Sequence, residues 1–265
     1  MIATLRLALI LAVLLPVTLV LAPVQLVLKL AAPKASRRIP LLWHRLVLWL
    51  LGVRVHLHGA MAGDRPLMIA ANHISWSDIL VLGSIGELCF IAKDEVRGWP
   101  VINWLARLQR TVFVDRQRKR DAAIQADTIA SRLTEGDVMV LFAEGTTGDG
   151  NQLLAFKSAL FAAPQMALEQ SGLQNISVQP VAIAYNTLHG MPLGRYHQPI
   201  AAWPGDVAFG AHFMRFLHEG AFDVDVAFGP VIEIDAQSKR KDVARQCERF
   251  VRGRFAILRR LHHRA

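Results

Sequence analysis

Apolar positions follow two patterns along this chain, one continuous and one interrupted. Residues 7–24 include no charged side chain, and past Gln25 the apolar run continues to Leu28. A helix of that length can cross the hydrocarbon core of a bilayer, so we predict a retained membrane anchor, with a cleaved signal peptide as the competing interpretation. Pro16 and Pro23 can break a helix, so a segment that dips into one leaflet and returns is a further alternative.

A second apolar segment at residues 41–51 carries Trp43, Trp49 and Arg45 among leucines. Indole rings favour the headgroup level of a membrane, so this pattern is typical of an interfacial helix. An ordinary core helix is the alternative for so short a segment. We expect an anchor and interfacial helix over residues 1–52 and one folded domain over residues 53–265.

Basic residues flank the first apolar run unequally. Lys29, Lys34, Arg37 and Arg38 follow the run, whereas Arg6 precedes it. The positive-inside tendency therefore places the C-terminal side in the cytoplasm. The sequence predicts a protein of a bacterial-type inner membrane with its folded domain on the cytoplasmic face.

Beyond the anchor, short apolar runs alternate with helical patterns, and turn residues separate them. Strands are predicted at residues 51–58, 67–71, 88–92, 111–115, 138–142, 178–185 and 222–228. Residues 77–82 are predicted to form the start of a helix, and further helices are predicted at 103–108, 119–134, 158–169 and 212–217. Strands separated by helices predict a single layered α/β domain, with a mainly parallel or mixed sheet flanked by helices and preceded by the membrane-anchoring helices.

Charge indicates what the chain binds. The net charge is +9, and basic residues concentrate at residues 116–120 and 245–264. An anionic membrane, an acyl carrier protein and nucleic acid all fit that charge. No zinc-finger spacing, aromatic RNA-binding signature or long basic arm accompanies it, so we expect no nucleic-acid partner.

Cysteine and paired histidine positions give no metal or redox site. Cys89 and Cys247 form no C-x-x-C pair and no disulfide framework. His56 and His58 alternate on one predicted strand, which is a metal-capable spacing. No third ligand accompanies them, so structural histidines and no metal site are expected.

The strongest chemical signal is Asn72-His73-Ile74-Ser75-Trp76-Ser77-Asp78, directly after an apolar segment. An imidazole titrates near neutral pH, and a carboxylate beside it can fix its tautomer and stabilise the imidazolium. His73 and Asp78 together can therefore take a proton from a hydroxyl. The spacing places His73 at the mouth of a helix and Asp78 one turn inside it, with the chain bending back between them.

Three further blocks follow in order. They are residues 110–116, a short strand ended by Arg116; residues 137–151, a strand that opens at Glu144-Gly145 into a glycine-rich loop; and residues 178–181, a strand with Pro-Val. Together with Asn72-His73 and Asp78, these blocks resemble the glycerolipid acyltransferase family typified by 1-acylglycerol-3-phosphate acyltransferases. The resemblance spans about residues 45 to 235.

The resemblance implies a role for each matching residue. His73 would take the proton from the acceptor hydroxyl as it attacks an acyl thioester, and Asp78 would steady the imidazolium. The binding residues would be Asn72, Arg116, Glu144, Gly145 and Thr146. Arg116 would hold an anionic group, with a surface ion pair to Asp115 or Asp121 as its alternative. No acyl-enzyme and no cofactor are needed, because the co-substrate, acyl carrier protein or coenzyme A thioester, is already activated.

Two residues depart from the family pattern. Ala143 stands where the family has proline, and Thr147 stands where it has an arginine that is thought to hold the acceptor phosphate. Threonine cannot supply that charge. The segments at 142–150, 153–160 and 196–206 look closer to the branch that acylates lyso-ornithine lipid, whose head group has no phosphate.

The sequence thus predicts a membrane-bound O-acyltransferase that moves a fatty acyl group to the free hydroxyl of a lysolipid, with lyso-ornithine lipid favoured. The alternative function is that of a 1-acylglycerol-3-phosphate acyltransferase, in which Arg110, Arg116 or Lys157 would contact the acceptor phosphate. A lipid hydrolase lacks support because no Gly-x-Ser-x-Gly elbow exists in the chain. A non-catalytic, membrane-tethered binding module would leave His73, Asp78 and Glu144 unexplained.

Overall fold

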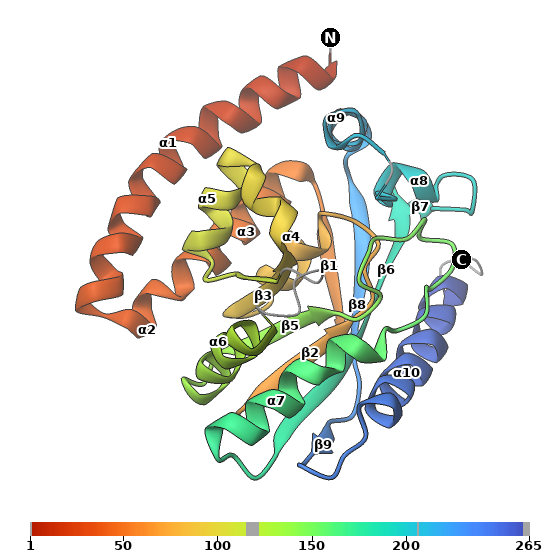
Figure 1. The fold of residues 1–265 in the computed structure, drawn as a ribbon. Helices are drawn as coiled ribbons and strands as arrows, with labels where there is room; N and C mark the ends of the chain where they lie inside the picture. Colours follow the sequence, from red (N-terminus) through yellow and green to blue (C-terminus); the bar gives the residue numbers. More distant parts are fainter. Residues whose placement is uncertain (1, 115–121, 206, 262–265) are drawn as a thin grey trace.

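The computed structural model describes residues 2–114, 122–205 and 207–261, and the first apolar run forms the helix α1 (Ile2–Ala31) within it. Pro16 and Pro23 lie inside this helix and do not break it. Figure 1 shows α1 as an arch along one side of the molecule, a curvature that fits the backbone hydrogen bonds lost at two prolines. Residues 4–31 are long and apolar enough to cross a membrane by length and composition.

The predicted interfacial segment is the amphipathic helix α3 (Arg38–Leu51), which a short turn α2 (Pro33–Ser36) joins to α1. One face of α3 is buried, whereas Trp49 on the other face is 74% exposed. Gly52 ends the helix in the left-handed conformation, with φ of 69°. The strand predicted from residue 51 therefore begins only at Arg54, because Leu51 belongs to the helix.

Within the described residues, the strands form one nine-stranded mixed sheet in the order β1-β8-β6-β2-β5-β3-β4, with β7 and β9 also paired to β6. Their bounds are β1 (Arg54–His58), β2 (Leu67–Ala71), β3 (Leu88–Lys93), β4 (Val112–Val114), β5 (Val138–Phe142), β6 (Ile176–Leu188), β7 (Met191–Pro192), β8 (Phe222–Phe228) and β9 (Ile232–Ile234). The strands β6, β2, β5, β3 and β4 run parallel, and β8, β7 and β9 pair with β6 antiparallel. The predicted mixed α/β sheet is confirmed.

Helices cover both faces of this sheet (Figure 1). Besides α1 to α3 they are α4 (Asp78–Gly83), η1 (Asp94–Gly98), α5 (Pro100–Leu108), α6 (Ala122–Thr134), η3 (Ser158–Phe161), α7 (Ala162–Ser171), α8 (Gln198–Ala201), α9 (Phe209–Glu219) and α10 (Arg240–Leu261). α4 packs on α3, whereas α10 packs on β6 and α7 on α6. The helix predicted at 119–134 is described from Ala122 onward, and its first residues lie outside the described part of the chain.

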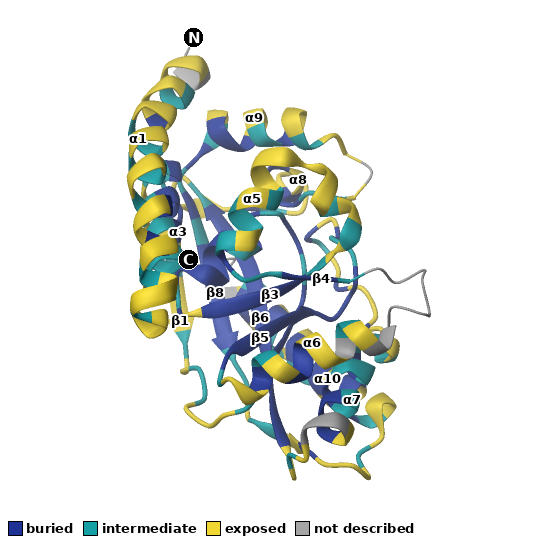
Figure 2. Ribbon diagram, turned by 60° about the vertical axis from the view of Figure 1, so that its left-hand side comes forward, coloured by how far each residue is buried: buried dark blue, intermediate teal, exposed yellow. Residues whose placement is uncertain are grey.

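The centre of the sheet is the core of the molecule. Every residue of β2 and β5 is buried, as Figure 2 shows for the central strands. Such strands read as continuous apolar runs because helices cover them on both faces. Ala71 pairs in register with Phe142 on one side and with Val181 on the other. The three sequence blocks at these residues therefore meet at one edge of the sheet.

Candidate active site

The candidate site lies where β2 and β5 end together. Parallel strands leave their carboxyl ends at one edge of a sheet, which is where ligands bind in open α/β folds. His73 follows β2 by two residues and Glu144 follows β5 by two residues. A hydrogen bond of 2.9 Å from the Ala143 N–H to the Ala71 carbonyl continues the pairing past both strands.

His73 and Asp78 are brought into contact as predicted from their spacing. Nδ1 of His73 lies 2.9 Å from Oδ2 of Asp78. Because an ionised carboxylate only accepts hydrogen bonds, Nδ1 must carry the proton, which leaves Nε2 as the basic nitrogen. The detail of the helix was wrong: α4 begins at Asp78, so this residue stands at the first position and not one turn inside.

Asp78 is fully buried and held on both carboxylate oxygens. Oδ2 also accepts the backbone N–H groups of Ile74 and Ser75, at 2.6 and 2.9 Å. Oδ1 accepts the hydroxyl of Tyr185 at 2.9 Å. The loop between β2 and α4 therefore wraps around the carboxylate that orients His73, which explains why two residues with four others between them are in contact.

Tyr185 and Ser77 belong to the site, although sequence reasoning missed the tyrosine. Ser77 Oγ lies 2.6 Å from the Tyr185 hydroxyl, and both residues are completely buried. Burial and the nearby Asp78 carboxylate hold the pKa of Tyr185 well above its usual range, so it remains a donor. Only the pairing of β6 beside β2 brings this residue to Asp78, and no local sequence signal announces it.

The glycine-rich loop after β5 packs on the histidine. The ring of Phe142 stacks on the His73 imidazole with centroids 3.8 Å apart, and the Gly148 N–H donates to the His73 carbonyl at 3.0 Å. Gly150 has φ of 75°, and a Cβ there would lie 2.7 Å from Oε1 of Gln198. Glycine is required at this position because the loop approaches α8 too closely for a side chain.

Glu144 is buried beneath this loop, with 1% of its surface exposed, and its Oε1 has no hydrogen-bond partner within the described residues. Burial raises the pKa of Glu144 to about 8, against hydrogen bonding from the backbone of His73 and Leu154. The carboxyl group is therefore largely protonated at neutral pH. Its binding to an acceptor stays a prediction, and contact would require the loop to move.

The other predicted binding residues are placed differently. Both ends of the Asn72 side-chain amide bond the backbone of Ile183, at 3.0 and 2.8 Å, so Asn72 ties the histidine loop to β6. Gly145 turns the chain after β5 with φ of 72°, and Thr146 is half-buried in the loop. Their contact with substrate remains a prediction. Arg116 lies outside the described residues, and so do both of its alternative partners.

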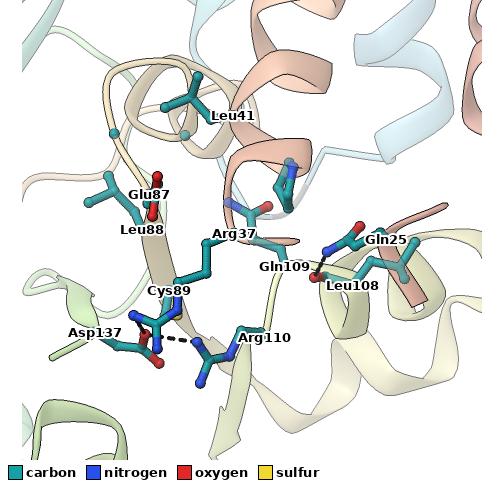
Figure 3. Close-up of a pocket in the computed structure, with 13 residues that line it drawn as sticks. Gln25, Arg37, Leu41, Glu87, Leu88, Cys89, Leu108, Gln109, Arg110 and Asp137 are labelled. Carbon is teal, nitrogen blue, oxygen red and sulfur yellow. Dashed lines mark hydrogen bonds and ion pairs between the residues drawn. The ribbon is translucent and has the colours of Figure 1, made fainter. Parts of the chain in front are cut away.

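Arg110, one of the alternative phosphate ligands, is at the other end of the sheet. It precedes β4 and contacts Asp137, which precedes β5, at 2.8 Å. Figure 3 shows Arg37 and Arg110 both directed at Asp137 beside a cavity of about 20 Å³. That space fits a water molecule and not a lipid head group. Lys157 is exposed, and its backbone N–H donates to the Ala143 carbonyl. It is therefore the candidate cation at the carboxyl end of β5, where His73 and Glu144 lie.

His56 and His58 each face an aspartate instead of converging on one point. Their Nε2 atoms lie 2.8 Å from Asp223 and 2.6 Å from Asp225 on the neighbouring strand β8. In the described part of the chain, no group of three or more His, Cys, Asp or Glu side chains could hold a metal ion.

The fold and this site belong to a known class. A family model described as Acyltransferase matches residues 52–184. The chain is 49% identical over 229 residues to the lyso-ornithine lipid O-acyltransferase of Rhizobium meliloti (strain 1021), covering 86% of this chain and 78% of that protein. It is 47% identical over 252 residues to the lyso-ornithine lipid O-acyltransferase of Brucella abortus (strain 2308), covering 95% of this chain and 94% of that protein. The chain therefore belongs to the acyltransferase family.

A solved structure shows the same fold. The crystal structure of the 1-acyl-sn-glycerophosphate acyltransferase PlsC from Thermotoga maritima superposes with a TM-score of 0.58 at 23% identity, covering 85% of this chain and 82% of that chain. The predictions of an acyltransferase enzyme and of its α/β fold are confirmed. A lysolipid acceptor and an acyl thioester donor follow from the family.

Proposed function

We propose that this chain transfers a fatty acyl group from an acyl thioester to the free hydroxyl of lyso-ornithine lipid. The observation that carries the proposal is the match, at 47% and 49% identity over most of their lengths, to two bacterial proteins named for this reaction. Thr147 supports it from within the site, because it leaves the position after Glu144, Gly145 and Thr146 without a cation for phosphate.

The geometry supports direct transfer. Nε2 of His73 takes the proton of the acceptor hydroxyl while the oxygen attacks the thioester carbonyl, and Asp78 stabilises the imidazolium through Nδ1. Collapse of the tetrahedral intermediate breaks the C–S bond, forms the ester and returns the proton from His73 to the thiolate. The thioester supplies the driving force, so this route involves no cofactor.

The alternative acceptor, 1-acylglycerol 3-phosphate, would be favoured only if another cation takes the place of the missing arginine. Lys157 is the specific candidate, because its backbone joins the end of β5 beside Glu144. Its exposed side chain would then hold the phosphate of 1-acylglycerol 3-phosphate. This second candidate predicts that Lys157→Ala weakens the phosphate acceptor selectively.

The deciding experiment compares both acceptors with purified protein, with His73→Ala as the inactive control. We expect a higher kcat/KM for lyso-ornithine lipid than for 1-acylglycerol 3-phosphate. Thr147→Arg should shift this ratio toward the phosphate acceptor by roughly tenfold to a hundredfold, the worth of a charge-assisted contact. A strong preference of the unmutated protein for the phosphate acceptor, unchanged by Thr147→Arg, would contradict the head-group assignment and leave acyl transfer standing.

The membrane attachment is part of the proposal. The outward face of α1 exposes a row of large apolar side chains, namely Leu5, Leu9, Leu15, Leu19, Val27 and Leu30. We place this face in the lipid, with the acyltransferase domain on the cytoplasmic side of a bacterial inner membrane. The acceptor would then enter the site from the leaflet in which α1 lies.

A further inference from the structure

The helix α10 carries a basic face that the acyl-transfer reaction does not use. Its sequence has eight Arg and Lys residues against Asp242 and Glu248. Lys241, Arg245, Arg249 and Arg252 recur at four- and three-residue spacing, which sets them on one side of the helix. All four are exposed, whereas Cys247, Val251 and Leu258 on the other side are buried against the body of the protein.

Part of this charge is uncompensated. Arg245 pairs with Asp242, and Arg252 pairs with Glu248 at 2.8 Å. Within the described residues no ion pair is found for Lys241, Arg249 or Arg260. A row of like charges repels itself, and an acidic partner relieves that repulsion.

The basic face lies away from the apolar one. Figure 1 shows α1 along one side of the molecule and α10 along the other. With the outer face of α1 in the lipid, the exposed face of α10 is directed to the aqueous side. A soluble acidic partner therefore fits this face better than the anionic membrane does.

α10 is also joined directly to the catalytic site. Glu248 accepts the backbone N–H of Phe156 at 3.1 Å, and Phe156 follows the glycine-rich loop that covers Glu144. Near the other end of the helix, Arg259 donates to the carbonyl of Tyr185, whose hydroxyl holds Asp78. A partner seated along α10 would thus lie beside the chain segment that follows the loop packed on His73.

We propose that the exposed basic face of α10 docks an acidic acyl carrier protein, which delivers the thioester to His73. The inference rests on the proposed acyl transfer and specifies its donor. The helix is about 33 Å long at 1.5 Å per residue. A nucleotide such as the one in coenzyme A could occupy only a fraction of that row, whereas the acidic surface of a small protein matches it. The carrier leaves as a free thiol after the acyl group has moved to the acceptor oxygen.

The test compares Arg249→Glu with Arg54→Glu. Arg54 is an exposed arginine on β1, so the control makes the same charge change on another surface. Each protein is assayed with the same acyl group on acyl carrier protein and on coenzyme A. We expect Arg249→Glu to lower kcat/KM for the acyl-carrier donor about tenfold, through KM, and to leave the coenzyme A donor and the control unchanged. Reversing Lys241 as well should enlarge the loss.

Binding is measured separately by fluorescence anisotropy of labelled acyl carrier protein, without any lipid acceptor. We expect binding that weakens with salt and is lost in the Lys241→Glu/Arg249→Glu variant, while flotation with anionic phosphatidylglycerol vesicles is unchanged. No binding by the unmutated protein, equal losses with both donors, or loss of vesicle binding instead would overturn the proposal. Carrier binding through α10 without acylation of lyso-ornithine lipid would retain the docking face and reject the proposed acceptor.

Discussion

At the scale of single residues, the site depends on how one buried carboxylate is shared. Oδ2 of Asp78 faces His73 and two backbone N–H groups, and Oδ1 faces Tyr185. The tyrosine touches no reacting atom, so it is a positioning residue. Its hydroxyl donates to the carboxylate that keeps Nδ1 of His73 protonated and Nε2 free to act as base.

We predict that Tyr185→Phe lowers kcat roughly tenfold, equivalent to about 1.4 kcal/mol in the barrier, with little change in KM. Removing the donor leaves more negative charge on Asp78, so protonation of the imidazole becomes easier. The acid limb of the pH–rate profile should therefore move to higher pH. Ser77→Ala should do the same more weakly, and Tyr196→Phe, at a 90% exposed tyrosine, should do nothing. A raised KM at unchanged kcat would assign Tyr185 to substrate binding.

Glu144 gives a pH-dependent prediction at the same scale. Burial raises its pKa to about 8 in the folded protein, above the value of 4.5 expected for an exposed glutamate. The folded state therefore holds a proton that the unfolded state releases, so this stabilising contribution is complete below pH 4.5 and is lost as the pH rises to about 8. Glu144→Gln removes the ionisation.

We expect the difference in Tm between Glu144→Gln and the unmutated protein to increase between pH 5 and pH 8.5. Each 1 kcal/mol of change in the free energy of unfolding shifts the Tm of a domain of this size by about 2–4 °C. Thermal unfolding in detergent across this range measures it. A constant Tm difference would mean that Glu144 is ionised at all these pH values. Glu169, an exposed glutamate on α7, provides the matched control as Glu169→Gln.

At the scale of elements, local sequence patterns predicted the bounds of three strands. Residues 67–71, 138–142 and 222–228 form strands with the predicted bounds. Each is an apolar or alternating run that ends at turn residues. Burial of its apolar side chains in the sheet stabilises such a run as a strand. The first two also place His73 and Glu144 at one edge, because parallel neighbours end together.

Long-range pairing decided the parts that the sequence did not reveal. Tyr185 reaches Asp78 across 107 positions, and Asn72 reaches Ile183 across 111. Neither contact leaves a periodic or spacing signal in the chain. Asp78 stands at the first position of its helix and not one turn inside it, because the loop from residue 73 closes on the Asp78 carboxylate before the helix begins.

At the scale of the whole molecule, α1 is bound to the acyltransferase body along its length. Arg6 donates to the carbonyls of Leu51 and Leu217, and a Cβ on Gly220 would collide with its guanidinium. Farther along, the Trp43 indole donates to Thr18 at 2.9 Å, and Gln25 donates to the Leu108 carbonyl at 2.7 Å. Arg6, Thr18 and Gln25 thus face the protein. The exposed apolar side chains Leu5, Leu9, Leu15, Leu19, Val27 and Leu30 face outward.

This arrangement favours a helix that lies in one leaflet over one that spans the bilayer. A spanning α1 would carry α3 and α9, which pack against it, into the hydrocarbon core. Buried polar backbone and the ends of short helices are costly there. The helix would then begin and end on the same side of the membrane, which is the cytoplasmic side if the proposed orientation holds.

We therefore predict that single cysteines on either side of α1, introduced as Thr4→Cys near its start and as Lys34→Cys in α2 just beyond its end, behave alike. Both positions are exposed, whereas the native Cys89 and Cys247 are buried and should stay unlabelled in the folded protein. In intact bacterial spheroplasts, a membrane-impermeant maleimide should label neither introduced cysteine, and permeabilisation should make both reactive. A periplasmic protein with an exposed cysteine serves as the positive control. Labelling of Thr4→Cys alone in intact spheroplasts would establish a spanning helix, whereas labelling of both would reverse the orientation and keep α1 in one leaflet.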